Sequence, residues 1–172
     1  MFRDCILSEC GRYRYRLSRR WAAGPTLLFI MLNPSTADAE VDDRTIRRCV
    51  AFAKAEGFCA IEVVNLYAYR ATKPADLKRA GYPVGPDNDD HIEAAVRAAS
   101  GVCLAWGANV AGLARPAVIQ TKLRALGIKP MCLRITRSGY PEHPLMLPSA
   151  CKLGPFTLEA IYEAMLSQDR SL

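Results

Sequence analysis

LLFIMLNPST, residues 27–36, is an apolar run that ends abruptly at an amide, a proline and two hydroxyls. A continuous apolar run of this kind is typical of a parallel strand that is buried on both faces. The polar groups that follow it form either a simple turn or part of a cleft, and this stretch by itself allows both. The other strands help to decide, because parallel strands end at the same edge of a sheet.

Strand and helix patterns alternate along the chain. Strands are predicted at 25–32, 59–69, 101–107 and 129–135, helices at 42–57, 87–100, 112–127 and 157–168, and a hairpin at 5–18. This alternation predicts a three-layer α/β/α architecture with a mainly parallel four-stranded central sheet, plus the N-terminal hairpin. The length suits one hydrophobic core, so residues 1–172 are predicted to form a single domain.

Composition limits the class of protein. Hydrophobic residues make up 51% of the chain, and the formal net charge is +6. No apolar run approaches the roughly 18–20 residues of a membrane helix. Arg3 and Asp4 stand where a signal peptide would be apolar, which predicts a cytoplasmic protein. The seven cysteines are scattered and odd in number, which favours reduced thiols, and we expect no metal and no cofactor.

The segment GRYRYRLSRRW, residues 11–21, alternates arginines with other side chains. In a regular strand this alternation would place Arg14 and Arg16 on one face and the tyrosines on the other. A row of guanidinium groups can contact phosphates of a nucleic acid. An amphipathic edge strand blunted by charge explains the pattern equally well, and the sequence leaves both interpretations open.

Polar or aromatic side chains follow three predicted strands in succession. The first strand ends at Asn33, the second runs into Asn65, and the third ends at Trp106. A fourth segment, the loop after the last strand, carries His143 between two prolines. An asparagine amide offers both a donor and an acceptor, which matches the edge of a nucleobase. Convergence of these groups at one edge of the sheet predicts a ligand site.

In the same order, these segments resemble motifs of the uracil-DNA glycosylase superfamily. The matching segments are IMLNPST, VVNLYA, GVCLAWGANV and HPLMLP, which begin at residues 30, 63, 101 and 143. The combination of LNPSTAD, DDRTIRRC, NLYAYRAT, AWG and HPL also closely resembles a bacterial and phage family catalogued as domain of unknown function 1643. The wider resemblance implies a uracil-DNA glycosylase-like fold.

The resemblance also implies a DNA glycosylase-like enzyme, active in DNA repair or modification, that hydrolyses the N-glycosidic bond of an extruded base. Asn33 would position the attacking water, and His143 would stabilise negative charge on the departing base. Asn65 would read the edge of that base. Further substrate contacts are expected from Pro34, Ser35, Tyr67 and Arg70, and nucleic-acid contacts from Arg14, Arg16, Leu145 and Met146. The expected partner is DNA or a nucleotide that contains the target base.

Two other functions remain open, and an acidic cluster is the basis of one of them. The cluster comprises Asp38, Glu40, Asp42 and Asp43. Helix capping explains part of it, but Asp42 and Asp43 are also candidates for acid/base chemistry or for a metal-dependent hydrolase. A catalytically inactive module that binds a nucleotide or nucleic acid is the other alternative. The sequence names neither the base nor the oligomeric state.

Overall fold

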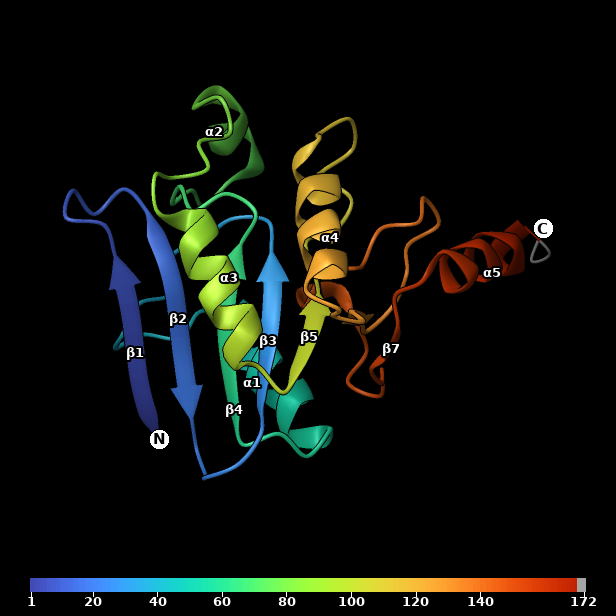
Figure 1. Ribbon diagram of the computed structural model, residues 1–172, viewed down its shortest axis with the longest axis horizontal. Coiled ribbons are helices and arrows are strands. Elements are labelled where there is room, and N and C mark those ends of the chain that lie inside the picture. The colour runs from blue at the N-terminus through green and yellow to red at the C-terminus, as the bar shows by residue number, and fades with distance from the viewer. Residues whose placement is uncertain (170–172) are drawn as a thin grey trace.

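A seven-stranded sheet forms the centre of the computed structural model, which describes residues 1–169 and the side chains of residues 1–167 (Figure 1). The strands are β1 Phe2–Leu7, β2 Arg14–Arg20, β3 Thr26–Met31, β4 Ala60–Asn65, β5 Gly101–Leu104, β6 Met131–Cys132 and β7 Gly154–Pro155. Their order across the sheet is β1-β2-β4-β3-β5-β6-β7. β4, β3, β5 and β6 pair in parallel, whereas β1, β2 and β7 are antiparallel to their neighbours.

The predicted count of four central strands was therefore wrong, although the four predicted strands do form the parallel centre. The N-terminal hairpin belongs to the same sheet, because β2 pairs with β4 through Leu17 and Val63. This pairing satisfies backbone groups that an open β4 edge would leave unpaired. β7 contains only Gly154 and Pro155 and carries no periodic pattern that could have revealed it.

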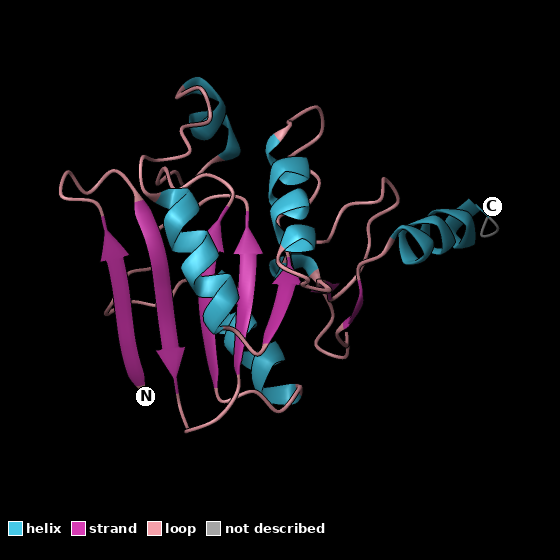
Figure 2. Ribbon diagram, in the orientation of Figure 1, coloured by secondary structure: helices cyan, strands magenta, loops and turns pink. Residues whose placement is uncertain are grey.

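Helices cover both faces of the sheet, and this confirms the mixed α/β architecture (Figures 1 and 2). α1 (Arg44–Ala55) packs on one face, and α3 (Asn88–Ala98) and α4 (Arg115–Ala125) pack on the other. The remaining helical segments are α2 Pro74–Arg79, the 3₁₀ turn η1 Pro144–Met146 and α5 Leu158–Asp169. Within residues 1–169, none of these helices is long and apolar enough to cross a membrane.

β3 is apolar throughout because it contributes to a core on each face. Leu28 and Ile30 pack into the core beneath α3 and α4, whereas Leu27 and Phe29 pack into the core beneath α1. All four side chains are fully buried. The alternation of side chains along a strand explains why both sets must be hydrophobic.

The chain reverses its direction across the sheet at β3. From β3 it passes through α1 to β4 on one side, and from β4 it then passes through α3 to β5 on the other side. The segment after β3 leads to α1 on one face of the sheet, whereas the segment after β4 leads through α2 to α3 on the other face. In open α/β sheets this switch point leaves a crevice for a ligand.

Candidate active site

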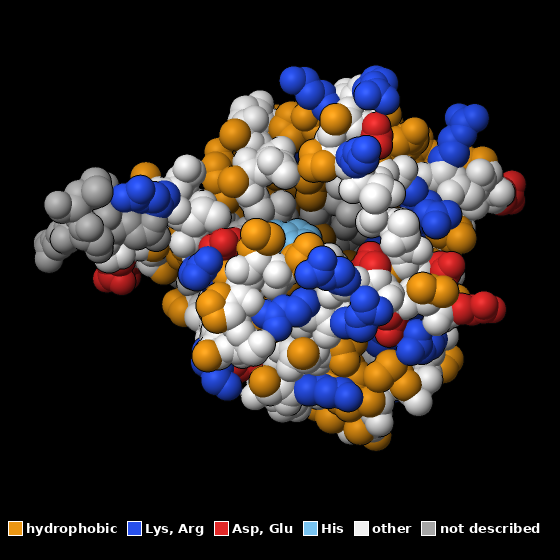
Figure 3. All heavy atoms as spheres, turned by 180° about the vertical axis from the view of Figure 1, so that it is seen from behind, with side chains coloured by type: hydrophobic (Ala, Val, Ile, Leu, Met, Phe, Trp, Pro, Cys, Tyr) orange, Lys and Arg blue, Asp and Glu red, His pale blue; other side chains and the backbone are white. Residues whose placement is uncertain are grey.

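A cavity of about 810 Å³ lies at this switch point. Its walls come from the segments that follow β3, β4 and β5, from the first turn of α1 and from the loop that carries His143. The molecule is hollowed on the face that α1 covers, and arginine and lysine side chains gather beside the hollow (Figure 3). The structure thus brings Asn33, Asn65 and His143 to one cavity, across more than half of the chain.

Asn33 is held by two hydrogen bonds from its amide nitrogen. Nδ2 donates to the carbonyl oxygen of Pro34 at 3.0 Å and to that of Ala71 at 2.8 Å. Because both partners only accept hydrogen bonds, the identity of the nitrogen is fixed by its surroundings. The side-chain oxygen Oδ1 is left as an acceptor on a cavity-lining residue, and an acceptor is what orients a water molecule.

Asn65 and Trp106 place unsatisfied donors in the cavity wall. Asn65 is 1% exposed and Trp106 is 2% exposed. Asn65 Nδ2 and Trp106 Nε1 are both buried and lack a hydrogen-bond partner among the described residues. The backbone of Asn65 is fixed by Asn88, whose Nδ2 donates to the Asn65 carbonyl at 2.9 Å. A buried donor without a partner costs about 1–3 kcal/mol, so a ligand that reaches these two side chains would gain by accepting from them.

His143 is a neutral donor in the same cavity. Its Nδ1 accepts a hydrogen bond from the backbone N–H of Leu145 at 3.2 Å, so the proton of the neutral imidazole lies on Nε2. Burial lowers the pKa of His143 below its usual value, and the nearby Asp43 carboxylate opposes this shift. Gly107 N donates to the Pro141 carbonyl at 2.8 Å and holds the loop against the end of β5. Gly107 has φ +75°, a conformation that favours glycine.

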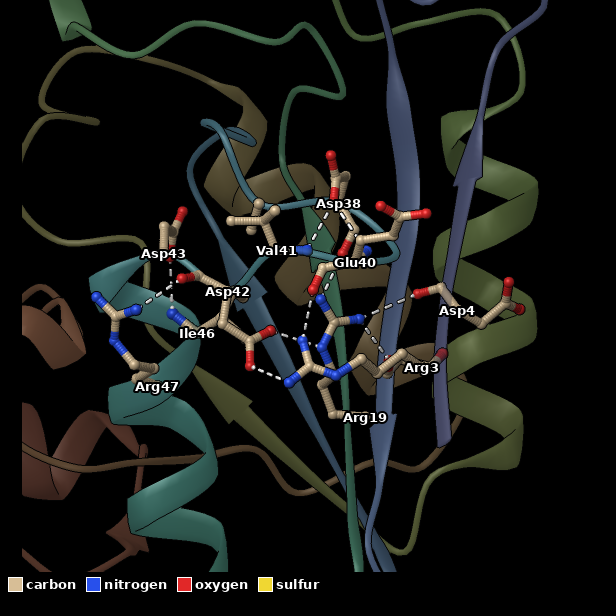
Figure 4. Close-up of polar contacts among 12 residues, drawn as sticks. Arg3, Asp4, Arg19, Asp38, Glu40, Val41, Asp42, Asp43, Ile46 and Arg47 are labelled. Carbon is tan, nitrogen blue, oxygen red and sulfur yellow. Dashed lines mark hydrogen bonds and ion pairs between the residues drawn. The ribbon is translucent and has the colours of Figure 1, made fainter. Parts of the chain in front are cut away.

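The acidic cluster is mostly structural (Figure 4). Asp42 pairs with the fully buried Arg19 at 2.7 Å and with Arg3 at 3.2 Å. Asp38 Oδ1 accepts from two backbone amides in its own turn, and Asp43 Oδ1 caps α1 by accepting from Ile46 N at 2.9 Å. Among the described residues no three His, Cys, Asp or Glu side chains could jointly hold a metal ion.

The arginines of β2 do not form the row that a regular strand would produce. A register shift in the β1–β2 pairing, between Ile6 and Leu7, interrupts the alternation of β2. Arg14 is buried, donates to the Ala37 carbonyl at 2.6 Å and lines the cavity, whereas Arg16 pairs with Glu62. The two guanidinium groups therefore have separate surroundings.

The predicted site residues divide into two groups. The cavity is lined by Arg14, Asn33, Ser35, Asp43, Asn65, His143, Leu145 and Met146. Five others do not line it: Pro34, Tyr67, Arg70, Arg16 and Asp42. Tyr67 packs against Tyr82 in the core at 5.3 Å between ring centroids, and Arg70 donates to the Gly11 carbonyl at 3.4 Å.

Eight further lining residues carry a side-chain donor and were not among the predicted site residues: Thr36, Arg44, Thr45, Arg47, Thr72, Trp106, Asn109 and Thr136. Trp106 stands at the end of a buried strand, a signal that was visible in the sequence. Arg44 and Thr45, in the first turn of α1, gave no such signal, because exposed polar residues are usual at the start of any helix.

These features define an α/β protein with a cavity of polar and apolar side chains at the carboxyl edge of its parallel strands. The chain belongs to the family described as "Protein of unknown function (DUF1643)", whose family model matches residues 14–145. The matched range contains every residue of the cavity wall named above except Met146. No curated protein and no solved structure matches the chain.

Proposed function

We propose that this protein is a uracil-DNA glycosylase-like enzyme that binds an extruded base in the cavity and hydrolyses its N-glycosidic bond. The observation that carries the proposal is the meeting of Asn33, Asn65 and His143 around one cavity of about 810 Å³. A volume of this size lies within the range of small-ligand sites, about 300–1,000 Å³. We expect it to accommodate a flat heterocycle together with its sugar.

In the proposed reaction a water molecule attacks the anomeric carbon of the sugar, and the bond to the base nitrogen breaks. The electron pair of that bond leaves with the base. Oδ1 of Asn33 accepts a hydrogen bond from the water and orients it. Asp43 lines the same cavity and is the carboxylate to which the water proton passes.

The donors of the cavity suit an anionic leaving group. His143 Nε2–H would donate to a base oxygen on which negative charge grows, and such preorganised donors lower the barrier most where charge develops. Asn65 Nδ2 and Trp106 Nε1 would find acceptors on the bound base, which would satisfy both buried donors. The neutral imidazole avoids placing a further positive charge beside the oxocarbenium-like sugar.

Base release from oligonucleotides tests the proposal. Single- and double-stranded oligonucleotides that carry different bases are incubated with the protein, with and without a chelator, and abasic sites are scored by alkaline strand cleavage. We expect release from at least one base, unchanged by the chelator. Asn33→Ala should lower the rate at least about hundredfold while binding is kept, because a misplaced nucleophile costs about that much.

Gln120→Ala is the matched control, since it removes an amide from α4 on the opposite side of the sheet. It should release the base at the wild-type rate. Full activity in Asn33→Ala would remove Asn33 from the mechanism. Salt-sensitive binding without release from any substrate would instead support an inactive binding module, and release abolished by the chelator would support a metal-dependent hydrolase.

A further inference from the structure

The geometry points to a phosphate subsite at the α1 end of the cavity, formed by the first turn of α1 and the buried guanidinium of Arg14. This inference deepens the proposed function and rests on it for the rest of the ligand, because it makes the substrate a nucleotide that bears a phosphate on its sugar. The phosphate belongs either to a free nucleotide or to a strand, and the chemistry of recognition is the same.

The first turn of α1 presents donors to the cavity. Arg44, Thr45 and Arg47 line it. The side chain of Asp43 accepts a hydrogen bond from Ile46 N alone. The backbone amides of Arg44 and Thr45 belong to the first turn of the helix and therefore have no intrahelical acceptor. The positive end of the helix dipole lies at the same place, and helix N-termini bind phosphate groups for both reasons.

Arg14 supplies a second, independent observation. It is 3% exposed and lines the cavity, and its Nε lacks a hydrogen-bond partner among the described residues. Among the described residues the guanidinium makes one hydrogen bond, to the Ala37 carbonyl, and no described carboxylate forms an ion pair with it. The Asp43 carboxylate favours the charged form of Arg14 but forms no ion pair with it. A buried charge without an ion pair is costly, so a bound anion explains why this arginine is kept at the cavity.

Burial lowers the pKa of Arg14 to about 10, which still leaves the guanidinium charged at neutral pH. Arg14 is thus a permanent buried cation, and its hydrogen-bonding capacity is only partly used. Arginine is also the side chain best matched to phosphate oxygens, since its planar fork can donate two parallel hydrogen bonds.

The negative charges of the cavity do not cancel these donors. Glu142 lines the cavity, but Arg134 neutralises it through two hydrogen bonds of 2.7 and 3.0 Å. Asp43 carries a charge near the site, and its Oδ1 is engaged as the helix cap. Arg44 is exposed and forms no ion pair among the described residues, and Arg47 donates to a backbone carbonyl, that of Asp42, at 2.8 Å. The cavity wall therefore has three arginines, Arg14, Arg44 and Arg47, and a single carboxylate without an arginine partner, that of Asp43.

Binding of 2-deoxyribose 5-phosphate tests the subsite without any assumption about the base. Its affinity for the full chain is compared with that of 2-deoxyribose by calorimetry at low salt. We expect the phosphate to improve affinity about tenfold to hundredfold, which is the usual effect of charged hydrogen bonds. The improvement should shrink as salt is raised, because ions screen the exposed part of the site.

Arg14→Gln should remove most of this improvement. Because Arg14 is buried, the exposed Arg44→Gln is tested beside it, and it should reduce the improvement without disturbing the fold. Arg124→Gln is the control, since it removes an exposed arginine of α4 on the other face. Circular dichroism checks that each variant is folded.

Equal affinity for the two sugars would overturn the inference, and so would wild-type discrimination in both folded cavity variants. A comparison with an oligonucleotide that carries a tetrahydrofuran abasic analogue distinguishes the two sources of phosphate. Tighter binding of the strand supports a phosphodiester, and tighter binding of the sugar phosphate supports a free nucleotide. Phosphate-dependent binding without base release would refute the proposed reaction alone, whereas release without phosphate discrimination would refute the subsite alone.

Discussion

At the scale of single residues, Asp43 has two separable roles. Its carboxylate caps α1 through Ile46 N at 2.9 Å, and the residue also lines the cavity close enough to influence His143. The first role needs only an oxygen acceptor, which an amide also provides. The proposed second role needs a group that accepts a proton, which an amide does not provide.

Substitution of Asp43 therefore distinguishes the two roles. Asp43→Ala should lower the free energy of unfolding by about 1 kcal/mol, because the cap is lost. Asp43→Asn should keep nearly all of this stability, because asparagine is an equally good cap. Base release should fall by about 10²–10⁴-fold in both variants. Denaturant unfolding and the abasic-site assay measure the two effects, and full release by Asp43→Asn would leave Asp43 with capping alone.

At the scale of elements, ion pairs join the segment before α1 to the N-terminal hairpin (Figure 4). Arg19 of β2 is fully buried, and it donates to Asp42 at 2.7 Å and also to the Asp38 carbonyl. Arg3 of β1 donates to the Glu40 carbonyl at 2.9 Å. The hairpin thus positions the start of α1, although only Arg14 of its own strands lines the cavity.

The Arg19–Asp42 pair should be important for stability. Asp42→Ala leaves the buried guanidinium of Arg19 without its counter-ion, and we expect a loss of about 3–5 kcal/mol. Asp76→Ala is the matched control, because it breaks an exposed pair with Arg79, which contributes about 0–1 kcal/mol. Urea unfolding compares the two variants, and losses of equal size would contradict the role assigned to Arg19.

At the scale of the whole molecule, the partly buried His143 makes stability depend on pH. Its pKa is lowered in the folded protein, so the unfolded chain binds the proton more readily. The stability that the neutral form of His143 contributes is fully present above about pH 6.5, the unfolded pKa, and it is lost as the pH falls below that value. We expect Tm to decrease on acidification, and to decrease less steeply in His143→Gln. Scanning calorimetry at several pH values checks this, and identical slopes would contradict it.

The sequence determined the parallel centre of the sheet and the groups at its carboxyl edge. Continuous apolar runs can be satisfied only by burial on both faces, and strands of one direction must end together. Together with the position of His143 in the loop after the last predicted strand, these two facts predict that Asn33, Asn65 and His143 meet at one edge. They could not supply β7, which has two residues and no periodicity.

Only the tertiary structure decided how the charged side chains are used. A register shift places Arg14 in the cavity and leaves Arg16 paired with Glu62, although the two lie two residues apart in the same strand. Neighbouring carboxylates likewise separate, since Asp42 pairs with Arg19 and Asp43 faces the cavity. The spacing of hydrophobic residues in the sequence indicates which faces of an element are apolar, because burial of apolar area is approximately additive along a chain. The partner of a charge depends instead on distances of a few ångströms between distant segments, and those are fixed only when the segments pack.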